Sequence, residues 1–262
     1  METAKTINPH DPASYPIDLL PCAKRIRAMV GGEVIVDSVN GFVLREHKHL
    51  PVYYFPRADV RMDLLHPSDH STHCPYKGDA RYFTIEAGGE RRENAVWTYQ
   101  EPFANVAEMK DLLSFYWLEM DQWLEEDEVV IRHARDPYVR VDTLPSSRHV
   151  KITVAGETVA DSSNGVFLFE TGLPPRYYLP KEDVRQDLLL ASDTTSECPY
   201  KGIAKYYSLQ IGDKKYKDFV WYYPDPLHES ARIKGLLCFF DEKVDQIELD
   251  GVLVPKPSTP WS

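Results

Sequence analysis

VKITVAGETVADSSNGVFLFET occupies residues 150–171 and has the pattern of three β-strands. Short runs rich in Val, Thr, Ile and Phe alternate with turn residues, which is typical of a β-rich domain. Gly156 marks the first turn, and Asn164-Gly165 marks the second, where we expect the positive φ angles of a tight hairpin. This stretch therefore predicts a series of strands joined by short turns.

The stretch is one part of an internal repeat that spans nearly the whole chain. Cys74 and Cys198 are related by a shift of 124 residues (198 − 74). The same shift aligns, without a gap, Asp37-Ser38 with Asp161-Ser162, Asn40-Gly41 with Asn164-Gly165, Tyr53-Tyr54 with Tyr177-Tyr178, and Trp97 with Trp221. A repeat of this length is a domain, because solenoid units are shorter and need more copies to bury a continuous core. The chain is therefore predicted to be two tandem homologous domains.

Comparison of the two copies predicts the remaining strands. Residues 109–127 could form an amphipathic helix, but their counterpart, residues 233–251, contains an internal glycine and a strand-like alternation, so strand is favoured. Residues 181–189 are predicted to form one helical turn before a strand, and residues 203–223 to form a hairpin around Gly212-Asp213. Each copy is predicted to be mainly β, a small barrel or sandwich of about six to eight short strands with short helical turns.

The repeat also sets the predicted domain boundaries. We expect an N-terminal extension (1–24), a first repeat domain (25–135), a linker (136–147), a second repeat domain (148–254) and a C-terminal tail (255–262). The sequence around the linker is polar and contains two prolines, as connecting segments often do. We expect the two repeats to pair with each other within the chain.

Composition and charge argue against several classes of partner. The formal net charge is −11, the pI is near 5.3 and no basic run occurs, which disfavours a nucleic-acid-binding surface. No apolar stretch is long enough to span a bilayer, and the N-terminal segment lacks the features of a signal peptide, so we expect a cytoplasmic protein with no membrane partner. The four cysteines show no CxxC spacing, so reduced thiols are expected.

The strongest candidate for chemistry is a CPYKG segment in each repeat. It occurs as Cys74-Pro75-Tyr76-Lys77-Gly78 and as Cys198-Pro199-Tyr200-Lys201-Gly202. A nearby lysine would lower the thiol pKa and activate the cysteine as a nucleophile. The lysine could instead hold a phosphate or a carboxylate. The structural alternative is a turn in which Pro sets φ, Gly supplies a positive φ, Cys fills an apolar hole and Lys is solvated.

Two further polar groups recur in both copies. Glu46 and Glu170 each end a predicted strand beside aromatic residues, where desolvation would favour the neutral carboxyl and suit acid or base catalysis; an exposed strand-end glutamate is the alternative. Arg61 and Arg185 each stand between two aspartates, and we expect the three residues to alternate along one strand face. Such a group could bind an anion or could be only a surface ion-pair ladder.

Repeated aromatic residues are candidates for the walls of a ligand pocket. They are Tyr53, Tyr54, Tyr76, Tyr82, Trp97 and Tyr99, with their counterparts Tyr177, Tyr178, Tyr200, Tyr206, Trp221 and Tyr223. Side chains of this kind could surround a planar small molecule, which is the partner we expect. The alternative is that they are core residues and cross-strand pairs.

Histidines near the first CPYKG segment raise the question of a metal. His66, His70, His73 and Cys74 are residue types that suit zinc, but the second copy has Leu, Thr and Glu in place of the three histidines. No P-loop, GxGxxG, GxSxG or HExxH motif occurs in the sequence. We therefore predict neither a metal nor a cofactor.

The motifs DS-x-NG, YY-[FL]-P, DVR-x-DLL and CPYKG occur in this order in both copies. In this combination the chain resembles domain-of-unknown-function family 427, which also carries a nucleotidyltransferase-like name. The resemblance covers about residues 25–130 and 148–254. It implies a small β-rich fold that also exists as single domains, so that the tandem chain mimics a dimer of such members.

Three functions remain open at this point. The first is an enzyme, of transferase or lyase type, that acts on a small organic molecule in a pocket formed by the repeated Glu, Tyr-Tyr, Asp/Arg and CPYKG residues. The second is a non-catalytic module that binds a small ligand or serves as a scaffold. The third is the nucleotide transfer implied by the family name, for which two-metal chemistry would need clustered acidic residues.

Overall fold

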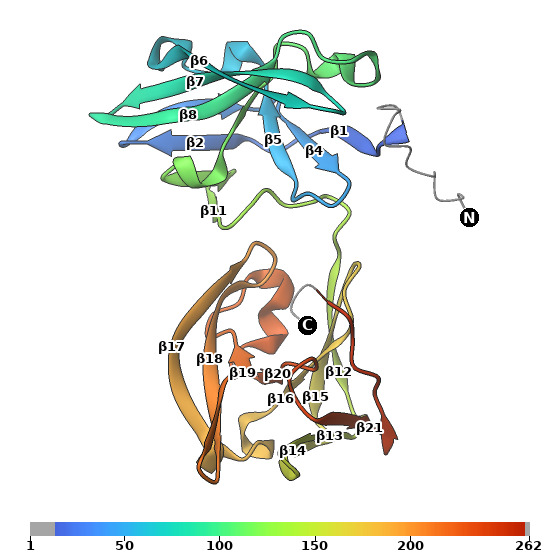
Figure 1. Cartoon of the computed structure of the whole chain (residues 1–262). Coiled ribbons are helices and arrows are strands. Elements are labelled where there is room, and N and C mark those ends of the chain that lie inside the picture. The colour runs from blue at the N-terminus through green and yellow to red at the C-terminus, as the bar shows by residue number, and fades with distance from the viewer. Residues whose placement is uncertain (1–13, 260–262) are drawn as a thin grey trace. The chain divides into compact units, whose positions relative to one another are not determined.

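The computed structural model describes residues 14–259, which divide into two compact units at residues 136 and 137 (Figure 1). Each unit is mainly β and contains one large sheet and one small sheet. The predicted mainly β, sandwich-like repeat with short helical turns is confirmed. Among the described residues, no helix has the length and apolar character needed to cross a bilayer.

The first unit has a seven-stranded sheet and a four-stranded sheet. The large sheet has the order β1 (Ile17–Pro21), β4 (Phe42–Glu46), β5 (Val52–Phe55), β9 (Leu113–Phe115), β8 (Glu90–Tyr99), β7 (Gly78–Ala87) and β6 (Leu65–Cys74). The small sheet has the order β11 (Glu128–Val130), β10 (Gln122–Glu125), β2 (Ile26–Val30) and β3 (Glu33–Ser38). In Figure 1, β6, β7 and β8 lie above β2, so the two sheets form two layers.

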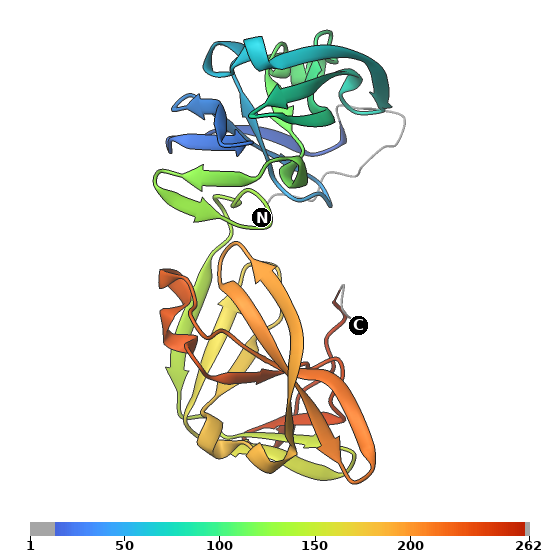
Figure 2. The same cartoon turned by 90° about the vertical axis from the view of Figure 1, so that its left-hand side faces the viewer.

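The second unit repeats this topology strand for strand. Its large sheet has the order β12 (Val141–Ser146), β15 (Gly165–Glu170), β16 (Arg176–Leu179), β20 (Leu237–Phe239), β19 (Lys214–Tyr222), β18 (Gly202–Ile211) and β17 (Leu189–Cys198). Its small sheet has the order β14 (Glu157–Ser162), β13 (Val150–Val154), β21 (Gln246–Leu249) and β22 (Val252–Leu253). Figure 2 shows the long, curved hairpin strands of this unit in orange. The sheets include β1 and β12, which come from the segments that the sequence assigned to the extension and the linker.

The large sheet of each unit has two apolar faces. In the first unit, one face packs against the small sheet in a core that includes Ile35, Tyr53 and Phe55. The opposite face carries a second cluster that includes Leu44 and Tyr54. Because successive side chains of a strand point to opposite faces, the adjacent tyrosines of β5 enter different clusters. The second face is the one on which the site described below is built.

The Asn-Gly pairs do not form the predicted hairpins. Strands β3 and β4 belong to different sheets, so Asn40-Gly41 is a corner at which the chain crosses between layers. The Ser38 hydroxyl accepts a hydrogen bond from the Asn40 N–H (3.0 Å), and a Cβ on Gly41 would lie 3.3 Å from the Phe55 ring. A side chain at this corner would require the Phe55 ring to shift by a few tenths of an ångström. The positive φ angles fall earlier in the chain, for example at Gly156 (78°) between β13 and β14.

The segment between the Tyr-Tyr strand and the next long strand also differs from its prediction. The aspartates and Arg61 were expected along a strand, but they lie on two short 3-10 helices, η2 (Arg57–Asp59) and η3 (Met62–Leu64), and at the junction between them. The second unit has the matching helices η6 (Lys181–Asp183) and η7 (Gln186–Leu188), where one helical turn was predicted. A 3-10 helix is defined by backbone hydrogen bonds between residues i and i+3. Alternating charges in a sequence do not indicate such bonds.

Two other strand predictions are confirmed. Residues 203–223 form the hairpin of β18 and β19, which turns at Gly212 with φ of 55°. Residues 109–127 contain β9 and β10, although the 3-10 helix η5 (Trp117–Glu119) separates them. Among the described residues each unit has eleven strands, β1–β11 and β12–β22, which is more than the sequence predicted.

Candidate functional site

The first unit contains a pocket of about 840 Å³ on the second face of its large sheet. It is lined by Leu44, Glu46, Lys48, His49, Leu50, Val52, Tyr54, His73, Cys74, Pro75, Tyr76, Lys77, Tyr82, Trp97, Tyr99 and Tyr116. Strands β4, β5, β7 and β8 supply alternate residues, which point to one face because the strand period is two. The turn between β6 and β7 closes one end. Segments that are far apart in the sequence thus meet at one cavity.

A buried ion pair occupies the polar end of this pocket. The Lys77 ammonium donates a hydrogen bond to the Glu46 carboxylate, and the two side chains are only 9% and 11% exposed. Lys201 and Glu170 form the same pair in the second unit, with exposures of 12% and 10%. The lysine is therefore not solvated as the turn hypothesis supposed, and the glutamate is not an exposed strand end. Removing one partner of such a pair would leave an uncompensated charge out of water.

The CPYKG turn that carries Lys77 is held rigidly. Gly78 has a φ of 100°, and Gly202 repeats it at 101°, so the glycine supplies the predicted positive φ. A Cβ on Gly78 would lie 3.2 Å from the Glu101 carbonyl oxygen. The Lys77 carbonyl accepts a hydrogen bond from the Phe103 N–H at 3.1 Å. The backbone of the turn therefore fixes the direction in which the lysine leaves the sheet.

Aromatic side chains form the walls of the pocket. The Trp97 indole N–H donates a hydrogen bond to the Tyr54 hydroxyl (2.8 Å), and the two rings meet edge to face at 90°. The Tyr116 ring lies 4.7 Å from the Trp97 ring, centroid to centroid. Burial raises the pKa of Tyr54 well above its usual value, and burial together with the hydrogen bond to Tyr82 raises the pKa of Tyr116 to about 12. Both hydroxyls are therefore neutral at physiological pH.

Not all of the predicted site residues lie at this pocket. The structure places Glu46, Tyr54, Cys74, Tyr76, Lys77 and Trp97 together in its lining. Tyr53 lies on the opposite face of the sheet, where its hydroxyl donates to Glu125. Its counterpart Tyr177 likewise packs in the core between the sheets of the second unit. A strand cannot direct two adjacent side chains into one pocket, which explains the separation.

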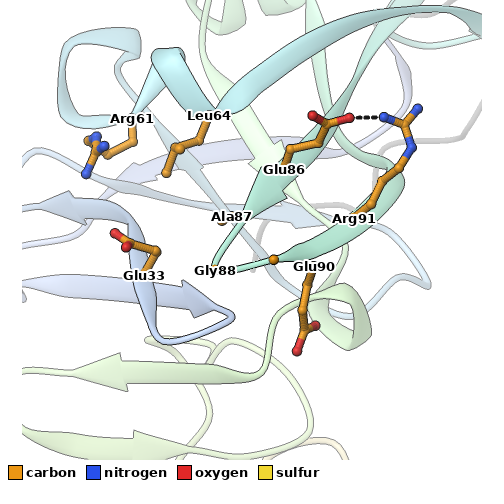
Figure 3. A pocket seen from close by; sticks show the side chains of 9 residues that line it. Glu33, Arg61, Leu64, Glu86, Ala87, Gly88, Glu90 and Arg91 are labelled. Atoms are coloured by element: carbon orange, nitrogen blue, oxygen red, sulfur yellow. Dashed lines mark hydrogen bonds and ion pairs between the residues drawn. The ribbon is translucent and has the colours of Figure 1, made fainter.

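The two predicted arginines lie on the surface. Arg61 pairs with Asp63 and Arg185 with Asp187, and all four side chains are exposed. Arg61 borders a different, shallow hollow of about 460 Å³, which Figure 3 shows with Glu33, Glu86 and Arg91 around it. Asp59 accepts a hydrogen bond from the Ser38 hydroxyl at 2.6 Å. The carboxylates of this segment thus have separate partners.

The histidines that precede the first CPYKG segment diverge in the structure. His66 lies beside Glu86, the His70 ring packs 4.5 Å from the Tyr82 ring, and His73 pairs with Asp79 at 2.7 Å. Of the three, His73 reaches the pocket. Within residues 14–259, no group of three or more His, Cys, Asp or Glu side chains is placed to hold a metal ion.

The sequence analysis did not identify every residue of the pocket, and Val52 is the most informative of those that it missed. Val52 stands two residues before Tyr54 on the same strand and faces the same side. In the second unit its counterpart is Arg176, whose guanidinium pairs with Asp241 (2.9 Å) and Glu242 (2.6 Å). A comparison of the two copies could have indicated this group. Val52 is replaced by Arg176, and the apolar pair Trp117-Leu118 is replaced by the acidic pair Asp241-Glu242.

The comparisons with known proteins agree with the repeat. Residues 18–126 and 142–250 each match the family described as Domain of unknown function (DUF427). The chain belongs to this family. The first match begins within β1 and ends just after β10, and the second begins within β12 and ends just after β21, so one match corresponds to each unit. No curated protein matches the chain.

Proposed function

We propose that the first repeat of this DUF427 chain is an enzyme that transfers a proton to or from a small organic molecule bound in its aromatic pocket. The observation that carries the proposal is the Glu46–Lys77 pair, a carboxylate and an ammonium that are almost removed from water at the end of a cavity of about 840 Å³. An acid or base side chain within reach of a ligand in a concave pocket is what general acid–base catalysis needs.

The two groups of the pair can have separate roles in a proton transfer at a carbon next to a carbonyl group. The Glu46 carboxylate accepts the proton from a substrate carbon, and the electron pair moves to the carbonyl oxygen. The Lys77 ammonium donates one hydrogen bond to Glu46 and has two further N–H donors, which can stabilise the developing oxyanion. Return of the proton from Glu46 to the substrate balances the step. Cys74 and Tyr76 border the same end and contact the ligand in this proposal.

The aromatic walls support a planar substrate. The rings of Tyr54, Trp97 and Tyr116 line the same pocket as the ion pair and contact one another through Trp97. Aromatic side chains pack favourably on flat apolar molecules, and the exclusion of water strengthens every charge interaction inside the site. The non-catalytic alternative uses the same walls but assigns no proton transfer to the pair.

Exchange of substrate protons with heavy water tests the proposal without knowledge of the full reaction. The protein is incubated in D₂O with a panel of aryl oxo acids and aryl diketones, and deuterium incorporation is followed by NMR. We expect at least one compound to exchange, and Glu46→Gln to slow that exchange by about 100-fold or more, since general base catalysis typically contributes this much. Glu86→Gln, an exposed glutamate outside the pocket, is the matched control.

The outcomes separate the two functions. Exchange that proceeds equally in wild type and Glu46→Gln contradicts a catalytic Glu46. Binding of panel members without any exchange assigns the pocket to a ligand-binding module instead. Thermal unfolding of both variants verifies that the loss does not come from a failure to fold.

A further inference from the structure

The retained and altered pocket positions of the two repeats separate into two groups. Of the sixteen lining residues, ten are identical in the second repeat: Leu44, Glu46, Tyr54, Cys74, Pro75, Tyr76, Lys77, Tyr82, Trp97 and Tyr99. The other six become Gly172, Leu173, Pro174, Arg176, Glu197 and Phe240. The ion pair and the aromatic interior are thus unchanged, and the differences lie around them.

We infer that the first repeat alone takes the substrate, a planar organic anion, and that Arg176 excludes this substrate from the second repeat. This inference rests on the proposed function and names its substrate class and a residue that determines specificity.

The Arg176 side chain occupies a place that, in the first repeat, belongs to the pocket beside Val52. It stands at the position of Val52, on the same strand face as Tyr178. Its guanidinium lies 5.6 Å from the ring centroid of Trp221, the counterpart of the pocket residue Trp97. Trp221 is buried, at 8% exposure, whereas Trp97 is only half-buried. The arginine therefore covers the indole face that a planar ligand would use.

The partners of Arg176 hold it in this position. The side chains of Asp241 and Glu242 are 6% and 2% exposed, so both carboxylates are as buried as the arginine. Glu242 also accepts a hydrogen bond from the Thr259 hydroxyl at 2.6 Å. The first repeat has Trp117 and Leu118 in place of the two acids, so the whole ion-paired group is specific to the second repeat.

The net charge of the lining residues differs between the two sites. In the first pocket, Lys48 and Lys77 face one carboxylate, Glu46, which leaves one positive charge when the histidines are neutral. At the equivalent lining positions the second repeat has two cations, Lys201 and Arg176, and two acids, Glu170 and Glu197, which leaves no net charge. Its Arg176 also pairs with the buried Asp241 and Glu242, which lie outside these positions. In a chain of net charge −11, a locally positive pocket selects for an anion.

The rim of the first pocket fixes the other end of the substrate. Leu50 and Tyr116 line the pocket yet are 57% and 46% exposed, so they present apolar surface at its mouth. An aromatic body would cover them, while its anionic group reaches Lys77 and Lys48. The second repeat has Pro174 and Phe240 there, and the Lys243 ammonium lies 4.2 Å from the Phe240 ring centroid.

A fluorescent aromatic anion tests the inference on the full chain. Anilinonaphthalene sulfonate and its uncharged analogue phenyl-naphthylamine are titrated, and the number of bound probes is measured by equilibrium dialysis. We expect one sulfonate per chain, bound about tenfold more tightly than the uncharged analogue, a ratio that corresponds to one favourable charge contact. Val52→Arg should abolish this binding, and Val129→Arg, an exposed valine of the same unit, should retain it.

The converse variant tests Arg176 directly. Arg176→Val combined with Asp241→Trp and Glu242→Leu removes the ion-paired group together, so that no buried acid is left unpaired, and two probes per chain are expected. Two probes on the wild-type chain, or equal binding by Val52→Arg and Val129→Arg, would overturn the inference. If the triple variant does not fold, the Val52→Arg result decides. Probe binding does not depend on turnover. If proton exchange is not observed, the proposed reaction is refuted, but the binding result still tests the role of Arg176.

Discussion

The two repeats share a backbone topology, and each contains a buried Glu–Lys pair, but they differ at several pocket positions, of which Val52 and Arg176 are the pair with the largest consequence in our account. Val52 leaves the first pocket open, whereas Arg176 extends over the indole of the second and pairs with two buried acids. The Glu–Lys pair and the aromatic interior are therefore present in both repeats, and we propose that access to them is not.

The largest stability effect should be common to both repeats. Lys77→Met and Lys201→Met each leave a buried glutamate unpaired, and each should lower the unfolding free energy of its unit by about 3–5 kcal/mol. Amide hydrogen exchange resolves the two units in the intact chain. A cost below about 1 kcal/mol, the value of a surface ion pair, would contradict the buried pair in that unit.

A smaller effect should differ between the repeats. In the first unit a Cβ on Gly88 would lie 1.9 Å from the Gly31 carbonyl oxygen, because the turns of two hairpins touch, whereas Gly212 in the second unit has open space. Gly88→Ala should therefore cost about 2–4 kcal/mol from overpacking and a positive φ. Gly212→Ala should cost about 1–2 kcal/mol from the positive φ alone. Equal losses in urea unfolding would show that the turns do not differ.

The smallest expected effect is a difference in acid sensitivity. Burial opposes ionisation of Asp218, but hydrogen bonds from Ser192 and Thr194 outweigh it and hold the pKa of Asp218 below its usual value. A lowered folded pKa stabilises the unit above the unfolded pKa of about 3.9, and this stability is lost as the pH falls through the folded value. The first unit has Asn94 at this position.

Asp218→Asn should therefore reduce the acid sensitivity of the second unit. The measurement is the unfolding free energy between about pH 5 and pH 2, the range in which a carboxylate of this kind takes up its proton. A variant with the same pH slope as wild type would contradict a stabilising ionised Asp218. Asp213→Asn, a turn residue of the same hairpin, is a suitable control.

Much of the fold followed from the repeat and from strand patterns. The alternation in residues 150–171 predicted strands, and the constant offset predicted two units of equal topology. The corner at Asn164-Gly165 was read as a hairpin, because local turn chemistry does not reveal that the next strand joins another sheet. The position of Arg61 on a 3-10 junction was missed for a related reason, since alternating charges fit both a strand and a surface turn.

The site was predictable in its residue types but not in its pairing. Glu46 and Lys77 were separate candidates that stand 31 positions apart in the sequence, and the sheet brings β4 beside the β6–β7 turn. Lysine is usually solvated, so its burial required a partner that the sequence alone did not identify. Strand parity could have shown that Tyr54 and not Tyr53 faces the pocket. The expected pairing of the repeats and the cytoplasmic location stay predictions.

The most direct test of the central claim compares Glu46→Gln with Glu170→Gln in the intact chain. Proton exchange on the best compound of the panel is measured in D₂O for wild type and for each variant. Glu46→Gln should lose about 100-fold or more of the exchange rate, and Glu170→Gln should lose far less, because Arg176 bars the substrate from the second site. Equal losses in the two variants, or a larger loss in Glu170→Gln, would contradict a division in which the first repeat alone carries the reaction.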